Sequence, residues 1–143
     1  MSDGKEMVRQ RFKELDAGNF EVLDELFSPD YELHPGGGAP PVDLEATKRL
    51  YRALYDAFPD LKHEIDFQLE DGDKVVTRWT ARGKQREGVL GASARDGEVT
   101  FSGINIYTID GGKFVRSDVS WDLLPVALPE RESLFGSARR ATR

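Results

Sequence analysis

The chain has 143 residues, of which 38% are hydrophobic and 32% are charged, and it carries a net charge of −6. These values are typical of one globular domain, and the acidic excess argues against general nucleic-acid binding, which needs a basic face. The sequence has no cysteine, which excludes disulfides and cysteine metal sites, and no apolar run approaches the ~20 residues that cross a bilayer.

The first part of the chain has helical periodicity. Its apolar spacing predicts a helix over residues 3–17 and a short second helix over residues 20–27. A short strand is expected at residues 30–34. A third helix is expected to begin after Asp43, which can cap it, and to end before Pro59.

The rest of the chain changes to the two-residue alternation of strands. Strands are predicted at residues 61–70, 74–82 and 98–109, and a last strand follows a tight turn at residues 110–112. In the first of these strands, one face is predicted to carry Leu61, His63, Ile65, Phe67 and Leu69. Helices followed by a strand meander predict an α+β fold, with helices covering one side of an antiparallel sheet.

The two ends of the chain suggest a single domain without a targeting segment. Residues 130–143 contain four arginines and two glutamates, and we interpret them as a flexible basic tail that follows a domain of residues 1–129. The N-terminus lacks the apolar core of a signal peptide, so a cytoplasmic protein is expected.

Asp122 is the first candidate for a functional residue. It lies late in the last predicted strand, next to Trp121 and followed by two leucines, so its carboxyl group is at risk of partial burial. Burial raises the pKa of a carboxylic acid, which makes it a usable general acid or base. The alternative is a strand-end aspartate that forms an ion pair with an arginine such as Arg78.

Seven short segments support a family resemblance. They are Tyr31-Glu-Leu-His34-Pro35, Phe58-Pro59-Asp60, Gly72-Asp73-Lys74-Val75-Val76, Gly88-Val-Leu-Gly91, Phe101-Ser-Gly-Ile104, Asp110-Gly-Gly-Lys113 and Asp122. In these segments and in its order of elements the chain resembles the SnoaL-like polyketide cyclases, within the wider nuclear transport factor 2-like fold. The resemblance covers roughly residues 5–126.

The resemblance carries expectations about fold and activity. It implies a cone-shaped α+β barrel in which three N-terminal helices and a curved, mainly antiparallel sheet enclose one apolar pocket. It also implies that Asp122 acts as general acid and base in an intramolecular aldol cyclisation, without a metal or cofactor, and that the protein is a homodimer paired through its sheet. Steroid isomerases, epoxide hydrolases and non-catalytic binding proteins share this fold, so the fold alone does not determine function.

Other charged residues are candidates beside Asp122. His34 precedes a loop rich in proline and glycine, and a histidine can exchange protons near neutrality. Arg78 lies among apolar strand residues, where it would pair with Asp122 or bind an oxyanion. Asp118, which stands where family members usually have tryptophan, shares a face with Asp122 and would either bind the far end of a substrate or be solvated. We interpret His63 as a core or edge residue, and the two histidines lack the spacing of a metal site.

A row of aromatic and amide side chains completes the candidates. Phe101, Asn105 and Tyr107 share one face of a predicted strand, and Trp79 belongs to the strand before it. These residues would line either the pocket or the opposite packing face. An asparagine in an aromatic row suggests the pocket, whereas the aromatic side chains by themselves are more typical of a packed core.

The resulting expectation is a cofactor-free enzyme acting on a small, apolar, polyketide-like ketone or ester by aldol cyclisation or isomerisation. Asp122 would remove a C–H proton, and Arg78, Asn105 or His34 would stabilise the enolate oxygen. One alternative is a non-catalytic small-molecule binder or scaffold. Another is an epoxide hydrolase, although Thr80 stands where such an enzyme would want a further acid after Arg78.

Overall fold

The structure is a computed structural model that describes residues 4–85 and 98–122. The elements within these ranges are α1 (Gly4–Asp16), α2 (Val22–Leu26), β1 (Phe27–His34), α3 (Leu44–Ala57), β2 (Lys62–Asp71), β3 (Lys74–Lys84), β4 (Glu98–Asp110) and β5 (Lys113–Asp122). The proposed basic tail at residues 130–143 lies outside the described residues, as does the family motif at residues 88–91.

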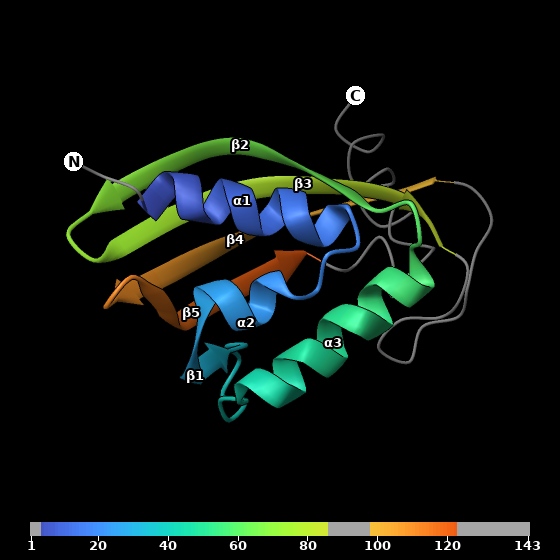
Figure 1. Cartoon of the computed structure of the whole chain (residues 1–143). Coiled ribbons are helices and arrows are strands. Elements are labelled where there is room, and N and C mark those ends of the chain that lie inside the picture. The colour runs from blue at the N-terminus through green and yellow to red at the C-terminus, as the bar shows by residue number, and fades with distance from the viewer. Residues whose placement is uncertain (1–3, 86–97, 123–143) are drawn as a thin grey trace.

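The five strands form one curved sheet with the order β1-β5-β4-β3-β2. β1 pairs parallel with β5, and the other three pairs are antiparallel. The helices lie over one face of the sheet, where α1 packs against β2 and β3 while α2 and α3 pack against β1 (Figure 1). The predicted α+β fold, with three helices on a mainly antiparallel curved sheet, is confirmed.

The helices begin and end where local chemistry favours it. Asp43 precedes α3, and its Oδ1 accepts a hydrogen bond from the backbone N–H of Ala46 at 2.9 Å. Pro59 follows the end of the same helix, as predicted. In α1 the residues at helical spacing, including Phe12 and Leu15, are buried under the sheet.

The first strand is longer than its sequence suggested. The predicted helix at 20–27 ends at Leu26, and β1 begins at Phe27 rather than at residue 30. The strand therefore includes Pro29, which lacks a backbone N–H. Because β1 is an edge strand, it tolerates this missing donor.

The turn between β4 and β5 is the tight hairpin that the sequence predicts. Gly111 and Gly112 have φ values of 60° and 77°, in the left-handed region that glycine enters without strain. The register shifts once after this turn, between Thr108 and Ile109, and beyond the shift Gly103 pairs with Trp121 and Ser102 with Asp122.

The sheet has an inner face toward the helices and an outer face away from them. The inner face of β3 and β4 carries buried side chains, namely Val75, Thr77, Trp79, Ala81, Val99, Phe101, Asn105 and Tyr107. The residues between them, such as Arg78 and Ile104, belong to the outer face because strand side chains alternate. The alternation predicted for residues 74–82 is confirmed.

The prediction of which β2 side chains share one face is correct only for the first half of the strand. The register with β3 shifts between Ile65 and Phe67, which makes Asp66 the extra residue of a β-bulge. After the bulge the faces exchange, so Phe67 and Leu69 are 52% and 61% exposed instead of buried. Gln68 turns inward and donates a hydrogen bond to Thr77 Oγ1 at 3.2 Å.

In the described ranges, no helix is both long enough and apolar enough to cross a membrane.

Candidate active site

A small cavity lies between α1, α3 and the inner face of the sheet. It is lined by Arg11, Phe12, Tyr51, Leu54, Tyr55, His63, Trp79, Asn105 and Trp121. Its volume is about 10 Å³, which is room for one water-sized group. Six elements contribute to this lining, and several of the side chains are polar. We call this space the inner cavity.

One wall of the inner cavity is a chain of buried hydrogen bonds across β3 and β4. The indole N–H of Trp79 donates to Asn105 Oδ1 at 2.9 Å, and Asn105 Nδ2 donates to the Tyr107 hydroxyl at 2.8 Å. Both ends of the Asn105 amide are therefore occupied, so its orientation is fixed. The predicted aromatic and amide row faces inward, and Phe101 packs beside it against Trp79.

His63, on the opposite wall, belongs to a buried aspartate–histidine pair. His63 Nδ1 lies 2.8 Å from Asp16 Oδ1, and Asp16 Oδ2 accepts the backbone N–H of His63 at 2.7 Å. The Tyr55 hydroxyl donates to the same Asp16 Oδ1 at 2.6 Å. The side chains of His63 and Asp16 are only 4% and 10% exposed. The end of α1, the start of β2 and the last turns of α3 meet at this carboxylate.

The environment of the pair sets its protonation near neutral pH. Burial alone would raise the pKa of Asp16, but the hydrogen bond and charge of His63 outweigh burial and lower that pKa below 3.8. Burial also lowers the pKa of His63 below 6.5, because it outweighs the contribution of Asp16. At neutral pH a carboxylate therefore faces a neutral imidazole, whose Nδ1–H donates to Asp16.

This arrangement leaves His63 Nε2 as a free base. None of the described residues hydrogen bonds to this nitrogen, and the ring lies between Phe12 and Trp79 with centroid distances of 5.0 Å to each. Asp16 holds the imidazole in one tautomer and orientation, as the aspartate of a catalytic triad does. An imidazole that is oriented by a carboxylate and has a phenol nearby can accept a proton and return it.

Sequence reasoning did not identify this pair. His63 was assigned to the core or edge, and Asp16 was not singled out. One signal was available, namely a histidine on the apolar face of a strand, where a buried imidazole needs a partner. The partner lies 47 residues away at the end of α1.

Two of the predicted catalytic residues lie outside the inner cavity. Arg78 lies on the outer face, where its Nη1 forms an ion pair with Asp66 Oδ2 at 2.6 Å. His34 ends β1, and its Nε2 lies 3.0 Å from the exposed carboxylate of Glu32. The two side chains are 35% and 24% exposed.

Asp118 also lies on the outer face, beside His34. It accepts two hydrogen bonds of 2.9 Å from the Arg116 guanidinium. This contact outweighs partial burial and lowers the pKa of Asp118, so the group is a carboxylate near neutrality. With His34, Ile104 and Ile106 it borders an open surface hollow of about 360 Å³.

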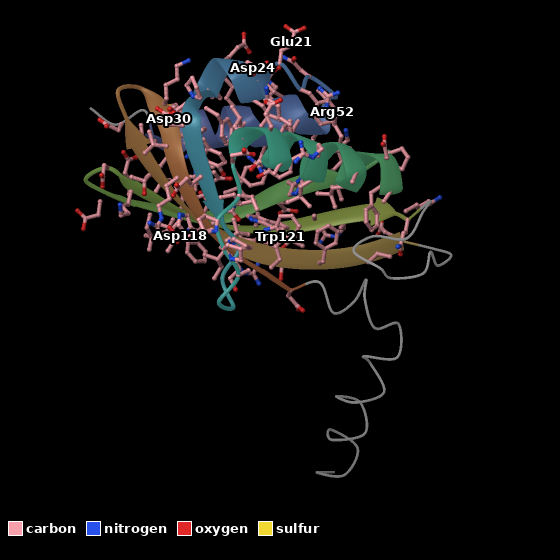
Figure 2. The ribbon with its side chains drawn as sticks, turned by 90° about the horizontal axis from the view of Figure 1, so that it is seen from below. Glu21, Asp24, Asp30, Arg52, Asp118 and Trp121 are labelled. Carbon is pink, nitrogen blue, oxygen red and sulfur yellow. The ribbon has the colours of Figure 1, made fainter. Side chains whose placement is uncertain are left out.

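Asp122 is the last described residue of β5. Its neighbour Trp121 packs against Trp79 at the inner cavity, with a centroid distance of 6.2 Å. By the alternation of strand side chains, Asp122 belongs with Asp118 on the outer face. Figure 2 shows Asp118 and Trp121 at separate positions along β5. The structure thus divides the predicted residues between the two faces of the sheet.

Comparison with known proteins identifies the family of the fold. The family model described as a SnoaL-like domain matches residues 8–117. The match includes Asp16, His63 and Asn105 but ends before Trp121 and Asp122. No curated protein matches the chain.

Solved structures agree with this fold. A protein of Acidithiobacillus ferrooxidans, proposed to be a polyketide cyclase, is 27% identical with a TM-score of 0.75, over 92% of this chain and 96% of its own. A SnoaL-like polyketide cyclase of Agrobacterium tumefaciens is 16% identical with a TM-score of 0.76, over 92% and 98%. AclR of Streptomyces galilaeus, proposed to be a hydroxylase, is 18% identical with a TM-score of 0.79, over 87% and 92%.

Proposed function

We propose that this chain, which belongs to the SnoaL-like domain family, is a cofactor-free enzyme that transfers a proton within a small, mainly apolar ketone or ester. The supporting observation is the buried Asp16–His63 pair, whose imidazole borders the inner cavity and which also lines an open hollow of about 400 Å³. A neutral imidazole with one nitrogen held by a carboxylate is a general base poised near neutral pH. The cyclase names of similar structures favour an intramolecular aldol cyclisation or an isomerisation as the reaction.

In the proposed reaction His63 acts as the base. Its Nε2 accepts a proton from a carbon next to a carbonyl group. The electron pair of the C–H bond forms a C=C bond, and the π pair of the carbonyl moves to its oxygen, which gives an enolate. In an aldol cyclisation the enolate carbon then attacks a second carbonyl carbon of the same molecule, whose oxygen becomes the alkoxide that takes the proton. Asp16 stabilises the imidazolium that forms, as a buried carboxylate does for a catalytic histidine. The imidazolium then returns its proton to the rearranged product, so the reaction needs neither oxidant nor cofactor.

The family resemblance assigns the same role to Asp122, and the two assignments differ in their location. His63 borders the inner cavity, whereas Asp122 belongs to the outer face at the end of β5. We favour His63 because its proton acceptor is buried and oriented. Under the alternative assignment Asp122 would be the base, with Arg78 or His34 near the enolate oxygen.

The test compares two variants on one set of substrates. Purified protein is incubated with polyketide esters, enones and epoxides, and the product masses are followed. We expect conversion without a change in mass, lost in His63→Gln by about 10²-fold or more and retained in Asp122→Asn. The reverse pattern would return the role to Asp122.

Other outcomes of this assay exclude the proposal altogether. Gain of one water would favour an epoxide hydrolase. A ligand that raises the melting temperature without being converted would favour a binding protein. Circular dichroism of both variants serves as the control for folding.

We also propose that the chain forms a homodimer through the outer face of its sheet. Phe67, Leu69 and Ile104 lie on this face and are 52%, 61% and 41% exposed. Paired strands bring Phe67 and Ile104 to the two sides of Arg78 in one row. Exposed apolar patches of this kind mark association surfaces.

Light scattering after size-exclusion chromatography tests the dimer. The double variant Phe67→Lys with Leu69→Lys should elute as a monomer if the wild-type protein is a dimer. Glu21→Gln on the helix side of the molecule (Figure 2) is the control and should leave the mass unchanged. A monomeric wild-type protein would contradict the proposal.

A further inference from the structure

Arg11 is a buried charge without a carboxylate partner. The residue is 4% exposed, and its guanidinium carbon lies 4.2 Å from the ring centroid of Phe12 and 4.8 Å from that of Tyr51. Within residues 4–85 and 98–122 no aspartate or glutamate pairs with it, and its Nε–H has no hydrogen-bond acceptor. An arginine stays protonated in proteins, so a permanent positive charge is buried here.

Such a charge is costly, and the aromatic rings and the polar contact with Tyr51 compensate for only part of the cost. Removing a cation from water costs several kcal/mol, whereas a desolvated cation–π contact returns about 2. Shape alone does not require arginine at this place, since methionine would fill similar space without a charge. The position therefore indicates a function for the positive charge.

A second donor at the same cavity also lacks an acceptor. The Trp121 Nε1–H is buried and unpaired, while the equivalent group of Trp79 donates to Asn105. Arg11 and Trp121 both line the inner cavity. The cavity thus has donors in excess, with room for one group of the size of an oxygen atom.

We propose that the inner cavity binds an anionic oxygen, that of a carboxylate or an enolate on a small molecule, with Arg11 as its charge partner and Trp121 as a second donor. A water molecule or a neutral carbonyl would accept these hydrogen bonds but would leave the arginine without a counter-charge. This inference names the substrate class and rests on the proposed function, because His63 lines the same cavity.

The two assignments fit one reaction. When His63 removes a proton from carbon, negative charge develops on the carbonyl oxygen of the substrate. A preorganised cation and N–H donor at that oxygen stabilise the charge as it forms. A substrate that already carries a carboxylate would use the same contact for binding.

An open hollow next to the inner cavity is bordered by charged side chains that are mainly basic, which suits an anionic ligand. This hollow of about 400 Å³ reaches Asp16 and His63 from outside and is bordered by Arg9, Lys13 and Lys62. In a chain with a net charge of −6, such a local cluster raises the concentration of anions at this point.

The two tryptophans allow a direct test, since they are the only ones in the chain and both line the inner cavity. The protein is titrated with acetate and with acetamide, which is neutral and nearly equal in size, and the indole N–H signals are followed by nuclear magnetic resonance. Acetate should shift the Trp121 signal as its N–H gains an acceptor. Trp79, which already has one, should change less.

The expected preference is quantitative. Acetate should bind at least about tenfold more tightly than acetamide, as expected for a hydrogen bond to a charged group. Arg11→Met should abolish this preference, and Arg11→Lys should restore part of it. Equal binding of the two probes, or an unchanged preference in Arg11→Met, would overturn the inference.

Two further measurements distinguish a loss of anion binding from a loss of folding and from a failure of the proposed function. Arg11→Met should melt at or above the wild-type temperature, because a buried unpaired charge is replaced by an apolar side chain. His63→Gln should lose turnover but keep the preference for acetate. Turnover that depends on His63 without any anion preference would contradict only the present inference.

Discussion

The two faces of the sheet hold charged side chains under different conditions. On the inner side, Asp16 and His63 are buried, and burial sets the pKa of the histidine. On the outer face, Arg78 pairs with Asp66 and Arg116 with Asp118 in contact with water, with side chains 31% to 48% exposed. Exposed pairs contribute little to stability. The comparison favours the inner side for the proposed proton transfer.

The largest effect is expected when the acid of the buried pair is removed. Asp16→Asn should lower turnover by about 10²- to 10⁴-fold, because His63 loses the carboxylate that fixes its tautomer and stabilises its imidazolium. The matched change on the outer face is Asp118→Asn, which should leave turnover near the wild-type value. Steady-state kinetics of both variants measure the two effects. A larger loss of turnover in Asp118→Asn than in Asp16→Asn would contradict the assignment of proton transfer to the inner side.

A second prediction concerns the packing on the two faces of β4. A methyl group on Gly103 would meet the Trp79 ring and the backbone oxygen of Ser120, so Gly103→Ala should destabilise the fold by about 1–3 kcal/mol. The neighbouring change Ser102→Ala should stay within about 0.5 kcal/mol. Urea unfolding measures both values, and equal values would show that the inner face tolerates repacking.

A third prediction uses pH. The pKa of His63 is lower in the folded protein than its ordinary value of 6.5, and that of Asp16 is lower than 3.8. Such groups contribute stability above the unfolded pKa and lose it as the pH falls toward the folded pKa. The melting temperature should therefore begin to fall below pH 6.5 and fall further below pH 3.8.

The groups that face His63 determine how this pH dependence is assigned. They are Asp16 and Arg11 from α1 and Tyr55 from α3, with Lys62 adjacent in β2. Burial raises the pKa of Tyr55, so it stays protonated throughout this range. His63→Gln should remove the first fall and weaken the second, because the His63 side chain supplies most of the contacts that lower the pKa of Asp16. If the melting temperature of His63→Gln still began to fall below pH 6.5, that fall would have to come from another group.

The smallest effect is expected for the outer ion pair. A double-mutant cycle with Arg78→Met and Asp66→Asn should give a coupling free energy of at most about 1 kcal/mol. Urea unfolding of the four proteins measures it. A coupling of several kcal/mol would mean that this pair is shielded from water in solution, as it would be within the proposed dimer interface.

Much of the fold could be predicted from the sequence because its elements carry strong local signals. Helical spacing, the cap at Asp43 and the glycines at 111–112 identify elements from neighbouring residues alone. Simple alternation predicted that Asn105 and Tyr107 share one face, although it left open whether that face is the inner one. These features depend on contacts that are short in sequence.

The candidate site was harder to predict because it depends on contacts between distant residues. The pairing of His63 with Asp16 requires the end of α1 to meet the start of β2, and no local pattern encodes that meeting. The family resemblance directed attention to Asp122, which the register places on the other face. Likewise, no feature of residues 61–70 signalled the bulge that exchanges the faces of β2.

The bulge at Asp66 has an evolutionary consequence. It divides β2 into a segment before it that serves the inner cavity through His63 and a segment after it that presents Phe67 and Leu69 to the outside. Substitutions in one segment need not disturb the other. A lineage carrying this bulge can therefore vary the side chains at its inner cavity and those on its outer face independently along a single strand.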